Sequence, residues 1–196
     1  MKKLLLLVPL IVFIIGCGGE EEANYFPLTV GNEWNYGFEM TRTDPDTTLT
    51  ETGSAKMEIT DETTLDNDTD VFEQVMTITF TDTLIPDVVD TSYFQETDDY
   101  IFEYDDKTST APDDTVLALP LEEGKTWGNY EVTGQEDVTV DAGSFDDCWE
   151  IMVIENGDTT YLYLAPNVGM VKMSSTEVEA EATYEMLMEL ETYTVQ

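Results

Sequence analysis

Apolar and polar residues alternate along much of this chain. Trp34, Tyr36, Phe38 and Met40 occupy every second position of one segment, with polar residues or glycine between them. Because successive side chains of a β-strand point to opposite faces of the sheet, this period of two predicts a strand with one buried face. Further strand-like runs follow at 48–60, 71–83, 88–95 and 100–104.

Short clusters of turn-forming residues separate these runs. They are rich in Asp, Asn and Pro, and they lie at 43–46, 66–68, 85–87 and 111–114. Such residues favour turns through their side-chain hydrogen bonds or their fixed backbone angle. No helical period lies between the runs. We therefore predict an all-β domain, a single antiparallel meander that forms a curved sheet or an open barrel.

The last segment carries two conflicting signals. Residues 176–191 are rich in Glu, Ala, Met and Leu, which favour a helix. The apolar residues, however, occupy every even position, which are Val178, Ala180, Ala182, Tyr184, Met186, Met188 and Leu190. Since burial of one face outweighs a propensity difference of a few tenths of a kcal/mol per residue, we predict one long closing strand.

One motif occurs twice. Pro27, Leu28, Gly31 and Trp34 stand before the first strand, and the same four residue types return at Pro120, Leu121, Gly124 and Trp127. We interpret this as two related halves, residues 25–117 and 118–196, each opened by a turn that leads into an aromatic strand. The alternative is a recurrent strand-entry turn without duplication.

The N-terminus has the features of an export signal. Lys2 and Lys3 precede an apolar run from Leu4 to Ile15, which is shorter than the roughly 20 residues of a membrane-spanning helix. Its end, Ile14-Ile15-Gly16-Cys17, resembles the bacterial lipobox. The resemblance implies that residues 1–16 are a lipoprotein signal peptide and that Cys17 carries diacylglycerol, with fatty acids such as palmitate. The alternative is an ordinary secretory signal with an accidental Cys.

Residues 17–24 form an acidic tether with a Gly-Gly start and three glutamates. They resemble the acid-rich tract that directs some lipoproteins of the Bacteroidetes type outward, although a plain spacer would look the same. Gly18 stands where an aspartate favours inner-membrane retention in enteric bacteria. We therefore expect a lipid-anchored protein of the outer membrane. The domain would face either the periplasm or the cell surface, and the sequence does not decide between the two.

The charge is strongly negative. The chain carries −36 at pH 7, and loss of Lys2 and Lys3 with the signal peptide leaves 5 basic and 43 acidic residues, or −38. Such a surface repels nucleic acid and anionic lipid headgroups. It suits cationic partners, divalent metals or a salty medium that screens the repulsion, and we favour the last.

Several chemistries lack their residues. The chain contains no histidine, which removes Ser-His and Cys-His catalysis and imidazole metal sites. With Cys17 lipidated, Cys148 has no partner for a disulfide, and its apolar surroundings indicate a small core residue. We therefore expect no cofactor, no metal and no catalytic residue.

Two acidic groups can be compared with known sites. Asp66, Asp68 and Asp70 resemble the start of a calcium loop, but Val71 and Thr77 replace the Gly and Glu that the pattern requires, so we interpret them as a solvated loop. Asp146 and Asp147, near Trp149 and Trp127, are the one carboxylate pair that could serve a glycosidase. Adjacent strand residues point to opposite faces, so at least one would need a distant partner.

The region 140–173 carries a further resemblance. Its motifs are Ala142-Gly143-Ser144-Phe145, Cys148, and Tyr161-Leu162-Tyr163-Leu164-Ala165-Pro166-Asn167-Val168-Gly169-Met170-Val171-Lys172. Together with the Pro-Leu-x-x-Gly-x-x-Trp opening, they resemble a pattern of uncharacterised exported and lipid-anchored bacterial proteins. Such families are similar to the open β-barrels of the lipoprotein-carrier type, which implies a curved β architecture whose concave face can hold an acyl chain.

The function follows only in outline. We expect a monomeric, non-catalytic envelope lipoprotein, anchored through Cys17, that binds or organises a partner outside the membrane. One alternative is a carrier of a hydrophobic ligand, which predicts a cavity lined by the Met and aromatic faces. Another is a carbohydrate-active enzyme, which predicts two carboxylates converging beside an exposed Trp. Spacing alone does not separate a filled core from a cavity lined by residues such as Phe72, Met76, Phe80, Met186 and Met188.

Overall fold

The computed structural model describes residues 23–82 and 84–196, so Cys17 and the signal peptide lie outside the described residues. Twelve antiparallel strands form one sheet, in the order β6-β5-β4-β3-β2-β1-β12-β11-β10-β9-β8-β7. Their bounds are β1 Glu33–Asp44, β2 Thr47–Thr64, β3 Asp70–Phe80, β4 Val88–Glu96, β5 Tyr100–Tyr104, β6 Asp114–Ala118, β7 Thr126–Trp127, β8 Tyr130–Val140, β9 Gly143–Glu155, β10 Asp158–Ala165, β11 Gly169–Glu179 and β12 Ala182–Thr194. The predicted all-β meander is confirmed. The described part of the chain contains no helix that could cross a membrane.

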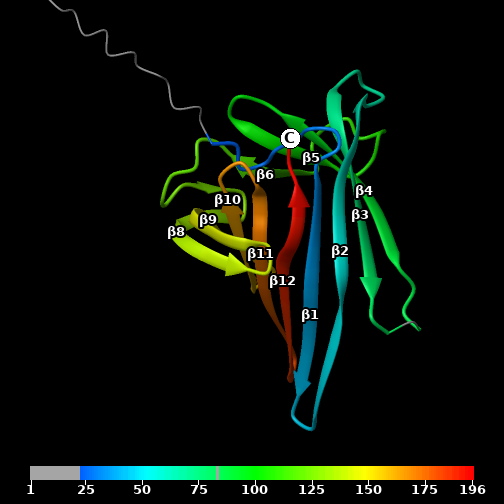
Figure 1. The fold of residues 1–196 in the computed structure, drawn as a ribbon, viewed down its shortest axis with the longest axis vertical. Coiled ribbons are helices and arrows are strands. Elements are labelled where there is room, and N and C mark those ends of the chain that lie inside the picture. The colour runs from blue at the N-terminus through cyan, green and yellow to red at the C-terminus, as the bar shows by residue number, and fades with distance from the viewer. Residues whose placement is uncertain (1–22, 83) are drawn as a thin grey trace, which may run out of the picture.

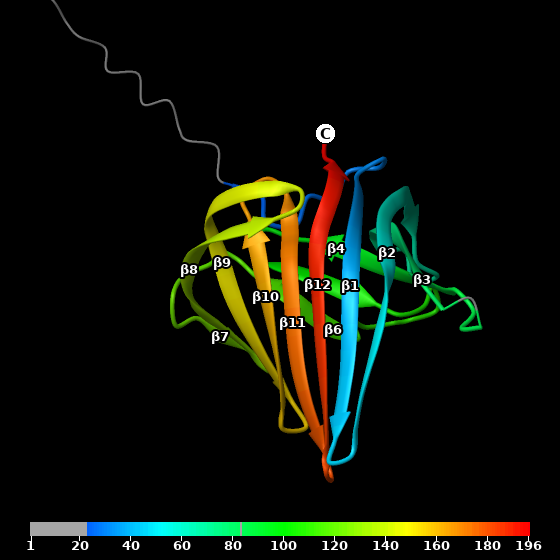
Figure 2. The same ribbon diagram turned by 60° about the horizontal axis from the view of Figure 1, so that its bottom comes forward.

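The sheet curls into a nearly closed barrel. β1 pairs with β12, which brings the first and last strands together, whereas β6 and β7 form the two ends of the sheet. β1, β2, β11 and β12 lie side by side and project together toward the lower end in Figure 1. The C-terminus and the first described residues lie at the opposite, upper end, as Figures 1 and 2 show. We call the lower end of these four strands the distal end.

The core lies on the inner face of the upper half. Trp34, Tyr36 and Phe38 of β1 are buried there. Tyr36 pairs with Leu190 of β12, and Phe38 pairs with Met188. Side chains across these two strands therefore share one buried face, as the alternation predicts. The Trp34 indole N–H donates to the Val168 carbonyl (2.7 Å), and the Tyr36 hydroxyl donates to the Met170 carbonyl (2.9 Å). These two bonds tie the opening strand to the start of β11.

Gly53 of β2 is required by close packing. A Cβ atom at this position would collide with the Thr79 carbonyl oxygen and the Phe38 ring. Its absence lets the Phe38 ring meet the Phe80 ring edge-on, with centroids 5.5 Å apart. The glycine therefore positions an aromatic contact that closes the lower boundary of the core.

The two copies of the opening motif adopt the same hydrogen-bonded turn. The Gly31 N–H donates to the Ile59 carbonyl and the Ile59 N–H to the Asn32 carbonyl; Gly124, Val132 and Lys125 repeat this pair of bonds. Both glycines have positive φ, 93° and 80°. Six strands follow each turn. The turns are equivalent, and the division into halves at 25–117 and 118–196 stays a hypothesis.

The predicted long closing strand is wrong in its extent. Residues 176–191 are extended, but a turn at Ala180 and Glu181 divides them between β11 and β12. Val178 pairs with Thr183 and is 67% exposed, so it faces away from Tyr184 and Met186, which the even spacing had placed beside it. Ala180 adopts φ 54°, a conformation rare for alanine, so composition did not signal this turn.

The region 144–172 forms three consecutive strands, as predicted. Asn156 and Gly157, both with positive φ, connect β9 to β10, and β10 ends at Ala165, directly before Pro166. Gly169 begins β11 with φ 92°. Local turn chemistry therefore accounts for the form of this motif.

Candidate functional site

The upper interior of the barrel is filled. The cavity there measures only about 50 Å³ and lies between the chain segment Phe26–Leu28 and Trp34, Tyr36 and Ile59. Phe26 lines this cavity, and its ring centroid lies 5.2 Å from that of Phe94. A space of this size is too small for a lipid chain, so this half of the aromatic stripe is core.

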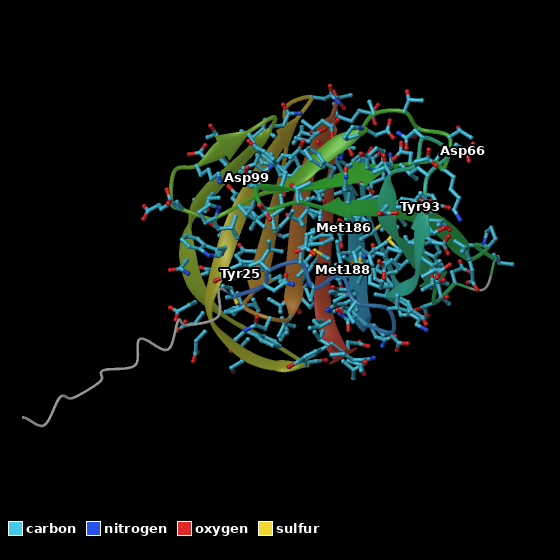
Figure 3. The ribbon with its side chains drawn as sticks, turned by 90° about the horizontal axis from the view of Figure 1, so that it is seen from above. Tyr25, Asp66, Tyr93, Asp99, Met186 and Met188 are labelled. Carbon is cyan, nitrogen blue, oxygen red and sulfur yellow. The ribbon has the colours of Figure 1, made fainter. Side chains whose placement is uncertain are left out.

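A larger hollow lies at the distal end. We call it the distal groove; its volume is about 530 Å³, and its lining residues are Met40, Thr41, Arg42, Leu49, Glu51, Ser175, Glu177, Tyr184, Glu185 and Met186. Figure 3, seen from above, shows Met186 and Met188 inside the ring of strands. Met188 is buried, whereas Met186, one step further along the inner face, lines the groove.

Strand register arranges this lining in two rows. One row runs Glu51, Met40, Met186, Ser175 across β2, β1, β12 and β11. The next row runs Leu49, Arg42, Tyr184, Glu177 across the same strands. Directly paired residues of antiparallel strands project from the same face, so all eight point the same way. Met40 and Met186 make the centre of the first row apolar. Glu51 stands at the β2 end of the first row, and Glu177 stands at the β11 end of the second row.

Arg42 is the one arginine of the chain. Its Nη2 lies 3.2 Å from the Asp44 Oδ2, and its guanidinium carbon lies 5.8 Å from the centroid of the Tyr184 ring. Its side chain is 45% exposed, so the ion pair with Asp44 contributes little to stability. The groove therefore joins an apolar floor to an exposed, polar rim.

Side chains close the seam between β6 and the β7–β8 hairpin. The Trp127 indole N–H donates to the Thr115 carbonyl (2.8 Å), and the Tyr130 hydroxyl donates to Asp114 Oδ2 (2.6 Å). The two rings stack, with centroids 5.2 Å apart and planes at 4°. Burial, and then the hydrogen bond to Asp114, raise the pKa of Tyr130, so this hydroxyl stays a donor at neutral pH.

Glu103 of β5 lies close to this seam and is half-buried. Burial raises its pKa; Ser92 offsets part of that rise, and the charges of Asp105, Asp114 and Asp90 add to it. Register places Glu103 opposite both Phe94 and Asp114. This carboxylate is therefore held among like charges, where its ionised form is disfavoured.

Glu103→Gln is expected to raise the melting temperature at pH 7.5. A raised carboxyl pKa means that the folded protein binds this proton more tightly than the unfolded chain does, so ionisation lowers the free energy of unfolding as the pH rises through the folded pKa. The gain should shrink as the pH falls toward the ordinary pKa of 4.5 and vanish below that value, where the carboxyl is protonated in both states. Calorimetry between pH 4 and 8 measures it. The exposed Glu62→Gln reports the general benefit of removing one negative charge, and an equal gain there would contradict a special role for Glu103.

The structure separates the acidic candidates from the groove. Asp66 and Asp68 lie in the β2–β3 loop, Asp70 begins β3, and Figure 3 places Asp66 at the periphery. Among the residues that the structure describes, no three acidic or cysteine side chains form a metal-binding group. Asp146 and Asp147 are both exposed on β9, where Asp147 has φ 54°.

Cys148 is fully buried in the main core. Burial raises the pKa of its thiol to about 11, so the reactive thiolate is scarce at neutral pH. Its position agrees with a core residue. The lipid-attachment prediction at Cys17 falls outside the described residues and stays a prediction.

Sequence reasoning identified one part of the groove and missed the rest. Met186 belonged to the predicted apolar stripe, and Met40 ended the alternation that begins at Trp34. Arg42, Leu49 and Ser175 carry no motif, and they come together only through the pairing of strands distant in sequence. Of these three residues, only Arg42 had a signal in the sequence, because it occupies the next even position after Met40.

Comparisons with known proteins concern solved structures. No family model and no curated protein matches the chain. A predicted lipoprotein from Parabacteroides distasonis is similar at TM-score 0.49 and 14% identity, over 88% of this chain and 99% of that one. A predicted exported protein with a YmcC-like fold from Bacteroides fragilis has a TM-score of 0.38 and 16% identity, over 88% of this chain and 99% of that one. A DUF1329 family protein from Desulfovibrio piger has a TM-score of 0.30 and 9% identity, over 86% of this chain and 88% of that one. The structures that this chain resembles thus include predicted lipoproteins and exported proteins.

Proposed function

We propose that this protein is a lipid-anchored envelope protein of the outer membrane, and that its β domain binds an apolar ligand in the distal groove without altering it chemically. One observation carries the proposal: the apolar inner face is filled at the upper end but open at the distal end. The groove volume of about 530 Å³ falls within the range of about 300–1,000 Å³ typical of ligand sites.

The side chains of the groove suit an apolar chain. Met40 and Met186 lie in register at its centre, and methionine adapts to irregular apolar partners because its side chain is unbranched and flexible. Leu49 stands at the rim with 54% of its surface exposed. A bound chain would cover this surface and gain roughly 25 cal/mol per Å² of apolar area removed from water.

The location of the domain follows from the proposed anchor. Diacylglycerol on Cys17 would hold the chain at a membrane, and the tether would join the domain at its upper end, where the first described residues lie (Figure 1). The distal groove would then open at the end farthest from the tether. This arrangement leaves the groove free to receive a ligand from the aqueous side.

Adjacent serines on β11 provide a direct test. Ser175 pairs with Met186 inside the groove, whereas Ser174 pairs with Leu187 on the opposite face. Ser175→Trp should fill the groove and abolish binding of the uncharged fluorescent probe N-phenyl-1-naphthylamine, and Ser174→Trp should leave it intact. The measurement uses the lipid-free mature chain with the Cys17→Ser substitution and titrates the probe at fixed protein concentration. Equal binding by both Trp variants, or no binding by the parent chain, would remove the proposal.

A further inference from the structure

We infer that the ligand of the distal groove is an amphiphile whose apolar chain carries a positively charged amine head. The inference rests on the proposed function and adds the charge of the ligand. It follows from the way in which carboxylates are placed in the groove and left without basic partners.

Two glutamates mark diagonal corners of the groove lining. Glu51 stands at the β2 end of the row that contains Met40 and Met186, and Glu177 stands at the β11 end of the row that contains Tyr184. An apolar chain lying on the methionine pair would therefore end beside a carboxylate at either side. The arrangement offers a negatively charged position for a head group at either end and the uncharged methionine pair for its chain.

Lysines pair with some of the carboxylates on the opposite face of the same strands. There, Lys56 lies 2.8 Å from Glu33 and 2.7 Å from Glu58, and Lys172 lies 3.5 Å from Glu189. Within the described residues, neither Glu51 nor Glu177 has a basic side chain within 4.0 Å. No lysine of the described chain lines the groove, so the two exposed glutamates stay accessible to a cationic ligand.

Arg42 does not neutralise the corner glutamates, because its ion pair is with Asp44. Its guanidinium carbon lies 5.8 Å from the Tyr184 ring centroid, so this ring already accepts a cation at the groove. An amine head would occupy the same kind of position, between an aromatic face and a carboxylate. Arg42 would compete with it.

The charge of the whole chain favours the same choice. A formal charge of −36 attracts cationic ligands and repels anionic amphiphiles such as fatty acids. An apolar groove alone would not distinguish an amine from an alcohol or a carboxylate of equal chain length. The corner glutamates supply the distinction, and their effect should weaken as salt screens it.

Three probes of equal chain length test the inference. Decylamine, decanol and decanoate, each below its micelle concentration, are titrated calorimetrically into the lipid-free mature chain at low salt and at 0.5 M NaCl. Decylamine should bind most tightly at one per chain, and decanoate least tightly. Since exposed charge pairs contribute modestly, Glu51→Gln and Glu177→Gln should each weaken decylamine binding about twofold to fivefold. Arg42→Gln should strengthen it by about the same factor.

Matched controls separate groove charge from general charge. Glu39 of β1 pairs with Thr52 and Leu187, on the face opposite to Met40, so Glu39→Gln removes the same charge outside the groove and should leave decylamine affinity unchanged. Equal weakening by Glu39→Gln and Glu51→Gln, equal affinity for decanol, or tighter binding of decanoate would overturn the amine head while the proposed function stands. Failure of all three probes to bind, or binding that Ser175→Trp does not block, would overturn both.

Discussion

The Cys17→Ser variant is expected to lose its fatty acids and to leave the membrane fraction. Each buried methylene of an acyl chain contributes roughly 0.8 kcal/mol, so one chain binds membranes only weakly and two or three bind them firmly. The protein offers no replacement anchor, since the charge of −38 that remains after loss of the signal peptide repels anionic headgroups. Incorporation of labelled palmitate, and the distribution between membrane and soluble fractions, measure the effect.

The control for this prediction is the second cysteine. Cys148 is buried in the core, so Cys148→Ala should keep the label and the membrane association. An unprocessed leader is itself apolar, so release is best measured on a Cys17→Ser chain whose residues 1–16 are exchanged for an ordinary secretory leader. Label on the Cys17→Ser variant, or its continued sedimentation with membranes, would contradict the anchor.

Trp34→Ala is expected to have the largest effect on stability, about 3–5 kcal/mol. Trp34 is only 6% exposed, and its indole N–H donates to the carbonyl of Val168, directly before β11, past the intervening strand β12. The substitution opens a cavity between the opening strand and β11, and it leaves that carbonyl without its partner. With about 2–4 °C for each kcal/mol in a domain of this size, the melting temperature should fall by about 6–20 °C. Thermal unfolding followed by circular dichroism measures this.

Two further variants distinguish the contributions. Trp34→Phe keeps most of the ring but not the hydrogen bond, so it should cost about 1–3 kcal/mol. Trp127→Ala, at the matching position of the second opening, removes a half-buried ring and should cost less than Trp34→Ala. An effect of Trp34→Ala below that of Trp127→Ala would show that the main core does not depend on the first opening.

The repeated opening shows what local sequence can establish. Pro27 to Trp34 and Pro120 to Trp127 predicted equivalent turns, and the hydrogen bonds of Gly31 and Gly124 are equivalent. The strands that follow differ: β1 has 12 residues and β7 has 2. Turn conformation depends on adjacent residues, whereas strand length depends on the partner that each strand finds.

The groove shows the converse. Met40 and Met186 are adjacent on the inner face although 146 positions separate them in the chain, because β1 pairs with β12. The turn at Ala180 sets the register that brings Tyr184 opposite Glu177, and alanine gives no turn signal. The pairing of β1 with β12 brings Tyr184 opposite Arg42. The groove residues could therefore not be grouped from their spacing alone.

The sequence by itself determined the strands, most of the turns and the buried side of the opening strand, because alternation and turn chemistry act between near neighbours. It also determined the negative charge and the absence of histidine, which limit the chemistry available. Only the tertiary structure decided where the apolar face is filled and where it stays open. Filling depends on side chains from strands far apart in the chain, whose register is set by pairing rather than by composition.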